Sequence, residues 1–441
     1  MLARLPRKLL NAALNGLIAS QRKLPIGGAC LGAGTTLELF LGGDKPTNGV
    51  LNHLASCADR SIVGIITAVP NRILVTGGAG FIGSHTVRAL VDSGERVRVL
   101  DSLRPPVHPP GRRPDLPDEV EFIEGSVDDR AALRAALADI DVVYHLAAYQ
   151  DYLTDFSTFY AINTVSTALI YELALAEKLP LRRVILAATQ AEYGEGPYRC
   201  PTDGTVYPAP RADAQLAEHR WEPACPRCGG TISPIPARED VVHPHSPYAM
   251  SKRAAEECAL TLGDRYGIPT AALRYSIVQG PGQSFRNAYS GALRAFTVQA
   301  LHGRRPLVYE DGQQIRDFVW IGDVVAANLL MLHHPAVPTG SFNVGGDREV
   351  RVLDVARMVS AAIGTDLEPD VPGIYRVGDT RHIRSDVTRL RELGWRPTAT
   401  QEDMVAAYVG WARAQPDMAD TSIVAVRRMR ELGVLRQAAT R

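Results

Sequence analysis

Short apolar runs alternate with helical patterns along much of the chain. The run Ile73–Val75 leads into a glycine-rich turn, which is followed by a helical pattern and by a second apolar run that closes at Asp101. Further apolar runs lie within residues 120–129, 141–151 and 182–194, and helical patterns separate them. Strands and helices that alternate in this order build a parallel sheet with helices on both faces. The pattern therefore predicts an α/β fold with a doubly wound parallel sheet of the Rossmann type.

The turn after the first run reads TGGAGFIG and contains Gly77, Gly80 and Gly83. Glycine is needed where the backbone bends tightly and where a pyrophosphate approaches main-chain N–H groups at a helix N-terminus. Asp101 lies 24 residues beyond Gly77, where a carboxylate accepts hydrogen bonds from both adenosine ribose hydroxyls and repels a 2′-phosphate. These residues predict a dinucleotide site that prefers NAD to NADP. The alternative is that Asp101 caps a surface turn.

Residues 246–267 carry the signals of a helix, with a Ser-Pro start and a glycine at the end. Tyr248 and Lys252 are four positions apart on it and therefore share one face. An ammonium held near a phenol lowers the pKa of the phenol, which can then take a proton from a hydroxyl as hydride leaves the same carbon. Thr189 follows a buried run, where its hydroxyl either bridges tyrosine and substrate or simply caps the strand end.

Over residues 71–415 the sequence resembles the extended short-chain dehydrogenase/reductase superfamily, in particular its branch of NAD-dependent nucleotide-sugar epimerases and dehydratases. This resemblance implies a doubly wound NAD domain, a smaller lobe that binds a nucleotide sugar, and a homodimer. The motifs that carry it are TGGAGFIG, HLAA, the Thr189 position, YAMSK, LRYSIVQGPGQ, GQQIRDFVWIGDVV and YRVGDTRHIRSDVTRLRELGWRP.

The resemblance also implies roles for individual residues. Thr189, Tyr248 and Lys252 would form the catalytic triad, while Arg316 and Arg376 would hold the diphosphate of the sugar nucleotide. The planar fork of a guanidinium pairs bidentately with phosphate oxygens, although either arginine can instead belong to a surface ion pair. The residues expected to contact NAD are Gly77, Gly80, Phe81, Ile82, Gly83, Asp101, Ala147, Ala148, Tyr248 and Lys252.

Some positions depart from the pattern of the family. Gly125 is followed by serine where many relatives have the aspartate that contacts adenine, which leaves Asp128 as the expected substitute. The asparagine of the family's LRYFN motif is replaced by Ile277, and Asn287 is the residue expected to supply a polar contact to the substrate instead.

The residues after Thr189 indicate which reaction is catalysed. Dehydratases of this family have Asp-Glu there, and decarboxylating relatives have a glutamate at the second position, but this chain has Gln190 and Ala191. Glu192 comes one place later and is expected to point elsewhere on a strand-like exit. Without an added acid or base, we expect epimerisation, most often at carbon 4 of the sugar.

The substrate expectation rests on resemblance alone. The sequence is most similar to bacterial epimerases of deoxythymidine-diphosphate-L-rhamnose, and a UDP-sugar is the other expected substrate. The alternatives are a net NAD-dependent reductase or dehydrogenase of a nucleotide sugar and a non-catalytic, NAD-binding redox sensor.

A cysteine-rich insert interrupts the family pattern over residues 195–240. It contains CPTDG and CPRCGG, each of which resembles a zinc knuckle, so we expect a structural zinc site in a flap near the sugar pocket. A metal-free loop and a disulfide or redox pair are the alternatives. Cys258, on the tyrosine helix, is expected to pack rather than to bind metal. The expected ligands are Cys200, Cys225 and Cys228, with Asp203 or His219 as the fourth.

Composition limits the partners and the compartment. The formal net charge is zero and no long basic run occurs, so we expect no nucleic-acid partner. The spacing of the six cysteines is unlike that of a small secreted disulfide protein, which favours a reducing, cytoplasmic setting. We expect no transmembrane helix and no membrane partner, because no segment offers about 18 uninterrupted apolar residues.

The domain organisation predicted from these patterns begins with a basic, then Gly-rich segment over residues 1–70. We expect a loosely ordered extension there or a start assigned too far upstream, with a targeting peptide or a membrane-surface helix as alternatives. The other expected parts are the NAD domain over 71–276 with its insert at 195–240, a mainly sugar-nucleotide lobe over 277–415 that partly returns to the NAD domain, and a C-terminal tail over 416–441.

Overall fold

A computed structural model describes residues 70–108, 114–151, 154–287, 291–334, 337–416 and 418–439. The residues from Pro70 onward form one compact unit. The predictions made for residues 1–69, which include Cys30 and Cys57, lie outside the described residues.

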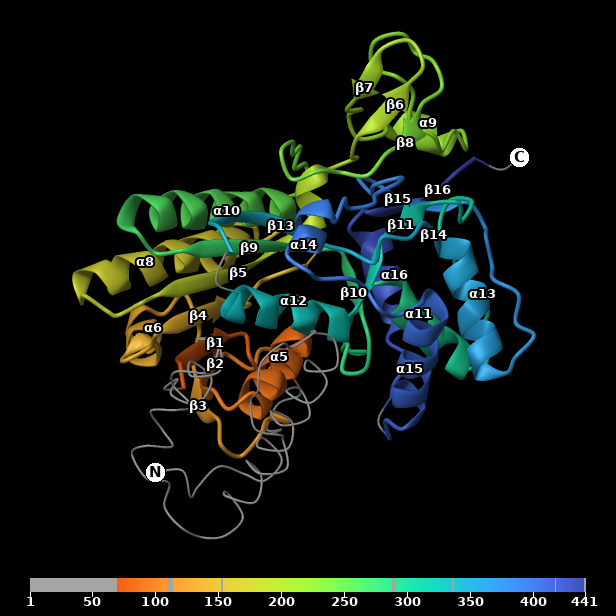
Figure 1. The fold of residues 1–441 in the computed structure, drawn as a ribbon. Coiled ribbons are helices and arrows are strands. Elements are labelled where there is room, and N and C mark those ends of the chain that lie inside the picture. Colours follow the sequence, from red (N-terminus) through yellow and green to blue (C-terminus); the bar gives the residue numbers. More distant parts are fainter. Residues whose placement is uncertain are drawn as a thin grey trace, which may run out of the picture. The chain divides into compact units, whose positions relative to one another are not determined.

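A seven-stranded sheet forms the centre of this unit, and every neighbouring pair of its strands is parallel. Because strands in such a sheet are buried on both faces, they are continuous apolar runs rather than alternating ones. The doubly wound parallel sheet predicted from the sequence is therefore confirmed (Figure 1). In spatial order the strands are β13 (Gly340–Val344), β9 (Thr270–Tyr275), β5 (Arg183–Thr189), β4 (Val142–His145), β1 (Arg72–Thr76), β2 (Arg96–Asp101) and β3 (Glu121–Glu124).

Helices cover both faces of the sheet, and each face has its own apolar core. Ile73 and Val75 of β1 pack in the core that contains α5 (Phe81–Asp92) and α12 (Ile321–His333). Leu74, between them, points to the opposite core. Figure 1 shows α8 and α10 on that second face. The helices of the second face are α6 (Arg130–Leu137), α8 (Ser166–Ala176) and α10 (Pro247–Tyr266).

One helical run, Phe156–Ala176, is long and apolar enough to cross a membrane by length and composition. It consists of α7 (Phe156–Phe159), the π-helix η2 (Tyr160–Val165) and α8. Half of its most apolar window is buried within the protein, and the sheet and α10 provide the contacts. This run therefore serves as a core helix of the described fold.

The segment after β9 builds a second group of elements. A separate apolar core joins α11 (Ala292–Leu301), α13 (Val352–Ile363) and α15 (Gln401–Arg413). Between these helices the chain returns to the large sheet, since β13 pairs with β9. The remaining elements here are β10 (Ile277–Gln279), β11 (Ile315–Arg316), β12 (Phe318–Trp320), β14 (Val350–Arg351), β15 (Ile374–Arg376), α14 (Thr388–Glu392), α16 (Ser422–Glu431) and β16 (Leu435–Gln437).

The cysteine-rich insert folds as a small unit of its own. Its strands form a three-stranded antiparallel sheet, with Tyr198, Cys200, Val206, Cys225 and Ile232 as a small core. The elements are β6 (Tyr198–Cys200), β7 (Gly204–Val206), α9 (Asp213–Ala217) and β8 (Ser233–Pro234).

Two glycine-to-alanine substitutions test the packing of the turn after β1. A Cβ at Gly83 would lie 2.1 Å from the carbonyl oxygen of Gly77, whereas a Cβ at Gly410 of α15 meets no atom within 4 Å. We expect Gly83→Ala to destabilise the protein by about 1–3 kcal/mol and to lower its NAD content. Gly410→Ala, the control, should leave stability unchanged or raise it by up to about 1 kcal/mol. Thermal unfolding compares the two, and an equally stable Gly83→Ala protein would contradict the packing argument.

Candidate active site

The strand order reverses between β1 and β4, which are neighbours in the sheet. In doubly wound sheets ligands bind at the carboxyl ends of the strands beside such a reversal. Gly77 follows β1, Asp101 ends β2, Ala147 follows β4 and Thr189 ends β5, so parallel pairing places all four residues at this edge.

The glycine turn brings two backbone segments into direct contact. Gly77 adopts the left-handed region with a φ of 69°. A Cβ on it would lie 2.7 Å from the Cα and the amide nitrogen of Ala147 in the loop after β4. The amide of Gly80 donates to the carbonyl of Gly77 at 3.1 Å and closes the turn. Only glycine fits this arrangement, which leaves the backbone of the turn open to a ligand.

This edge fits the pyrophosphate and the ribose of NAD. Helix α5 begins after Gly80, and it has neither a side-chain cap nor an acidic residue in its first turn, so its N-terminal amides are available to an anion. The Asp101 carboxylate accepts from the amides of Ala79 and Leu103, both at 3.0 Å. Phe81 and Ile82 form the first turn of α5, and Ala148 is exposed in the loop after β4.

The tyrosine helix has the ends predicted for it. The Ser246 hydroxyl accepts from the amide of Ala249 at 3.1 Å, proline occupies the first turn, and Gly267 ends the helix in the left-handed region. Tyr248 lies in the first turn of α10. Burial raises the pKa of Tyr248 to about 12, and the nearby Thr189 side chain opposes the rise.

Lys252 lies one turn further along α10 and is 2% exposed. Burial lowers the pKa of its ammonium to about 8, while the nearby carboxyls of Glu192 and Glu256 oppose that decrease. Lys252 therefore carries a positive charge near neutral pH. Tyr248 and Lys252 thus lie one turn apart on α10, which packs against β5, the strand that ends at Thr189.

The chain after Thr189 does not continue as the strand-like exit expected from the sequence. Residues Gln190–Tyr193 form a 3₁₀ helix, η3, which the Thr189 hydroxyl caps by accepting from the amide of Ala191. This turn directs Glu192 into the protein, where its side chain is 0% exposed and lies 3.6 Å from the Arg274 guanidinium. Burial, then the neighbouring Glu256 carboxyl, raises the pKa of Glu192 to about 8.

Both predicted diphosphate ligands line a cavity of about 180 Å³. Arg316 donates to the carbonyls of Thr380 and Arg381 at 2.8 and 3.0 Å, and Arg376 donates to the Asp379 carboxylate at 3.1 Å. A carboxylate beside two arginines holds their positions before a ligand arrives.

Other residues predicted for this half of the site have different surroundings. Ile277 lines the cavity, whereas Asn287 is not among the described residues that line it. Asp128, the expected adenine contact, is exposed and accepts a hydrogen bond from Ser126. The adenine and substrate roles of Asp128 and Asn287 stay predictions.

The tip of the insert gathers four potential metal ligands within 4.8 Å of one another, namely Cys200, Asp203, Cys225 and Cys228. The sulfur of Cys200 is 3.6 Å from that of Cys228 and 3.5 Å from an Asp203 oxygen, which is 3.2 Å from the sulfur of Cys225.

The two other residues considered for this metal site lie apart from the cluster. His219 contacts the carbonyl of Ala439 at 2.8 Å, so Asp203 and not His219 completes the set. Cys258 is half-buried on α10.

Comparison with known proteins identifies the family. A model of the NAD dependent epimerase/dehydratase family matches residues 73–213 and 229–345. The chain belongs to this family. The unmatched residues between the two segments fall inside the cysteine-rich insert.

Relatives within the NAD dependent epimerase/dehydratase family are similar over nearly their whole length. A dTDP-L-rhamnose 4-epimerase of Burkholderia thailandensis is 33% identical over 354 residues, which are 78% of this chain and 96% of that protein. The UDP-glucose 4-epimerase of Thermotoga maritima, solved with UDP-glucose, is 27% identical with a TM-score of 0.63 and covers 78% and 98% of the two chains. The UDP-glucuronic acid 4-epimerase of Bacillus cereus, solved with NAD, is 25% identical with a TM-score of 0.61 and covers 77% and 98%. The protein is thus an enzyme of the NAD-dependent nucleotide-sugar epimerase family.

Sequence reasoning missed three features of this family member's site. The burial of Glu192 has only a weak signal, an acid three residues after the end of a buried strand. Asp379 lies three positions after Arg376, a spacing that could have indicated an ion pair. Helix α16, within the predicted C-terminal tail, contributes Ser422 and Met429 to the cavity lining, and its amphipathic pattern could have revealed a helix.

Glu192 should make stability depend on pH. Its pKa is raised from 4.5 to about 8 in the folded chain, so the folded state holds a proton that the unfolded chain releases between these values. The stabilisation is complete below pH 4.5 and is lost as pH rises towards about 8, by at most about 1.4 kcal/mol per pH unit. We expect Glu192→Gln to lose less stability than the wild type between pH 5 and pH 8.

Thermal unfolding at the two pH values measures this difference. Glu257→Gln on α10 is the control, because the Glu257 side chain is 60% exposed and pairs only at the surface with Arg253. A Glu192→Gln protein with the same pH dependence as the wild type would show that Glu192 is ionised throughout.

Proposed function

We propose that this protein is an NAD-dependent epimerase that inverts carbon 4 of a deoxythymidine- or uridine-diphosphate sugar, with dTDP-L-rhamnose as the first candidate. The observation that carries the proposal is that Tyr248 and Lys252 lie one turn apart on α10, which packs against β5, the strand that ends at Thr189. Gln190 and Ala191 occupy the positions where dehydratases have their additional acids, and Glu192 is 0% exposed. The site is therefore equipped for oxidation and reduction of one carbon but not for elimination.

The chain's own residues hold and move one proton. Tyr248 takes the proton of the sugar hydroxyl and later returns it, and the nearby Thr189 hydroxyl orients the phenol. Lys252 lies one turn away on the same helix face, where its positive charge would favour the phenolate against the burial that raises the pKa of Tyr248 to about 12. Bound NAD would supply the redox chemistry at the same carbon, as acceptor and then donor of the hydride, which would return to the opposite face of the keto sugar. Water must be kept away from the keto sugar during this interval, which suits the burial of Lys252, a side chain that is 2% exposed.

The diphosphate is the part of the substrate for which the structure offers the clearest recognition. Arg316 and Arg376 line the same cavity. Each planar guanidinium carries about five N–H donors, some of which already bond the Thr380 and Arg381 carbonyls and the Asp379 carboxylate, and its fork geometry suits phosphate oxygens. These contacts do not discriminate between thymine and uracil. The Burkholderia relative acts on a dTDP-sugar by its name, and the two solved relatives described above act on UDP-sugars by their names, so both nucleotides belong in the test.

Epimerisation predicts turnover without added cofactor. Purified protein is incubated with a panel of dTDP- and UDP-sugars, and products are resolved by NMR. We expect a new stereoisomer of unchanged mass, because the hydride returns to the sugar. Conversion only after NAD or NADH is supplied, with stoichiometric cofactor consumption, would instead identify a net oxidoreductase. Absence of turnover under both conditions would favour a non-catalytic NAD-binding sensor.

Two matched tyrosine variants assign the proton transfer on α10. Tyr248→Phe should lower kcat by about 10²- to 10⁴-fold while NAD stays bound. Tyr266→Phe on the same helix, where the side chain is 47% exposed, should leave kcat unchanged. Retention of full activity by Tyr248→Phe would place the catalytic base elsewhere.

We also propose that the insert binds one structural zinc ion through Cys200, Asp203, Cys225 and Cys228. Zn–S bonds of about 2.3 Å and a Zn–O bond of about 2.0 Å, arranged tetrahedrally, separate the ligand atoms by about 3.5–3.8 Å. Three of the separations within the cluster are 3.2–3.6 Å and all are within 4.8 Å, which supports this set. Four protein ligands leave no open position, so the ion would stabilise the insert and take no part in catalysis.

Metal analysis of the purified protein should find about one zinc per chain, as expected for one tetrahedral site. Cys225→Ser and Cys228→Ser should lose the zinc and lower the thermal unfolding midpoint, whereas Cys258→Ser should retain it. A wild-type protein that binds no zinc even after reconstitution under reducing conditions would contradict the proposal. Thiol titration would then distinguish a disulfide from a metal-free insert.

The homodimer and the cytoplasmic location stay predictions. Exposed apolar side chains on α7, η2, α8 and α10 support a dimer, and sedimentation of the purified protein tests it. These side chains are Phe156, Tyr160, Val165, Leu175, Met250 and Tyr266.

A further inference from the structure

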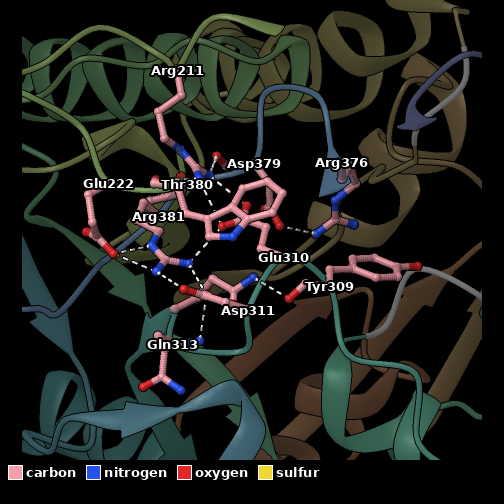
Figure 2. A network of polar contacts seen from close by, with 12 residues as sticks. Arg211, Glu222, Tyr309, Glu310, Asp311, Gln313, Arg376, Asp379, Thr380 and Arg381 are labelled. Carbon is pink, nitrogen blue, oxygen red and sulfur yellow. Dashed lines mark hydrogen bonds and ion pairs between the residues drawn. The ribbon is translucent and has the colours of Figure 1, made fainter. Parts of the chain in front are cut away.

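Buried ion pairs join the insert to the segments around the cavity that Arg316 and Arg376 line. Arg211 donates to both carboxylate oxygens of Glu310 at 2.9 Å, and both side chains are 1% exposed (Figure 2). The same guanidinium donates to the main-chain carbonyl of Asp379 at 2.8 Å. One arginine of the insert thus fixes a carboxylate and a loop that are distant from it in sequence.

A second residue of the insert contacts the same loop with the opposite charge. Glu222 accepts from the Arg381 guanidinium at 2.9 and 2.5 Å and from the His382 ring at 2.9 Å. Arg381 is 1% exposed and also donates to Glu310 and Asp311, so it completes the network in Figure 2. The Glu222 side chain is 58% exposed. Its substitution therefore leaves Arg381 paired with Glu310 and Asp311.

A third connection leads from the loop to the cysteine cluster. The amide of Arg381 donates to the Glu195 carboxylate at 2.7 Å, and the Tyr198 hydroxyl contacts the same oxygen at 3.2 Å. Tyr198 begins β6, and Cys200 of the cluster ends that strand. The cluster and the loop are therefore two ends of one short, buried path.

The loop held in this way carries the groups that position both predicted diphosphate ligands. Arg316 donates to the carbonyls of Thr380 and Arg381 and lies 3.5 Å from the Asp379 carboxylate. Arg376 donates to that carboxylate at 3.1 Å. No described residue of the insert lines the cavity itself, so any influence of the insert on the substrate passes through Asp379–Arg381.

We propose that the insert is a brace that holds the Asp379–Arg381 loop and thereby sets Arg316 and Arg376 for a nucleoside diphosphate. Arg211 and Glu222 are its positioning residues, and binding of a metal ion by the cysteine cluster keeps the brace in place. This proposal rests on the proposed function, in which Arg316 binds the diphosphate. The expected flap beside the pocket is thus replaced by a support behind the arginines.

The test is the affinity of the NAD-containing protein for dTDP and UDP, measured by calorimetry. Glu222→Gln and Arg211→Lys should each weaken binding about tenfold. KM for the sugar nucleotide should rise by the same factor while kcat and NAD content stay within about twofold, because the catalytic triad is untouched. Arg220→Ala is the matched control on the insert, since Arg220 pairs only with Glu218 and both side chains are 64% exposed.

Arg316→Ala separates failure of this proposal from failure of the proposed function. If Arg316→Ala does not weaken binding, Arg316 is not a diphosphate ligand and the proposed function loses its support in this cavity. If it weakens binding but Glu222→Gln and Arg211→Lys do not, the brace is wrong. An equal loss in Arg220→Ala would also overturn the brace, because it would show general loosening of the insert.

Cys228→Ser tests the contribution of the metal cluster in the same assay. Thermal unfolding and NAD content first establish that the variant is folded. We expect the same tenfold loss of dTDP and UDP affinity as in Glu222→Gln, about 1.4 kcal/mol. A folded, metal-free variant with wild-type affinity would show that the cluster does not act on the loop.

Discussion

A buried ammonium is the constraint on which the catalytic half of this protein depends. Lys252 is 2% exposed, and removing such a charge from water is costly unless opposite charges surround it. Glu256 provides such a charge, and Arg274 donates to Glu256 at 2.9 and 2.5 Å. Lys252 and Glu256 lie on α10 and Arg274 lies on β9, so compensation of one charge ties this helix to the neighbouring strand.

The cavity half uses the same principle with different residues. Arg211, Glu310 and Arg381 are almost entirely buried and satisfy one another through charged hydrogen bonds. Apolar packing tolerates small shifts of side chains, whereas a buried ion pair requires its partner at hydrogen-bond distance. Site geometry in both halves is therefore set by matched charges, while the apolar cores supply the general stability of the fold.

The sequence was sufficient for the features that depend on local pattern. Apolar runs of the right length predicted the strands, and Ser246, Pro247 and Gly267 predicted both ends of α10 because caps act on neighbouring backbone groups. The prediction of an extended chain after Thr189 was wrong. A 3₁₀ helix and an extended segment have similar local sequence signals, but they direct the Glu192 side chain to opposite sides.

Contacts between distant segments were beyond reach for a different reason. Arg211 meets the carbonyl of Asp379 across 168 positions, and nothing in either local sequence specifies the other. The cysteine cluster was predictable only in part. The ligand types and their knuckle spacing were visible in the sequence, whereas the choice of Asp203 over His219 depended on the position of His219 in the folded chain. The helix α16 beside the cavity was missed because the family pattern ends before it.

The separation of contacts along the chain also bears on the order in which the protein assembles. Cys200 and Cys228 are 28 positions apart, whereas Arg211 meets Glu310 across 99 positions. Short loops close at a lower entropic cost than long ones, and local contacts form earlier. During synthesis the insert can therefore fold around its cysteines while β9 and β13 are still absent from the sheet. The later segments, which carry Glu310 and Arg381, then dock onto a surface that already presents Arg211 and Glu222. The small insert therefore aligns a part of the chain that is synthesised after it.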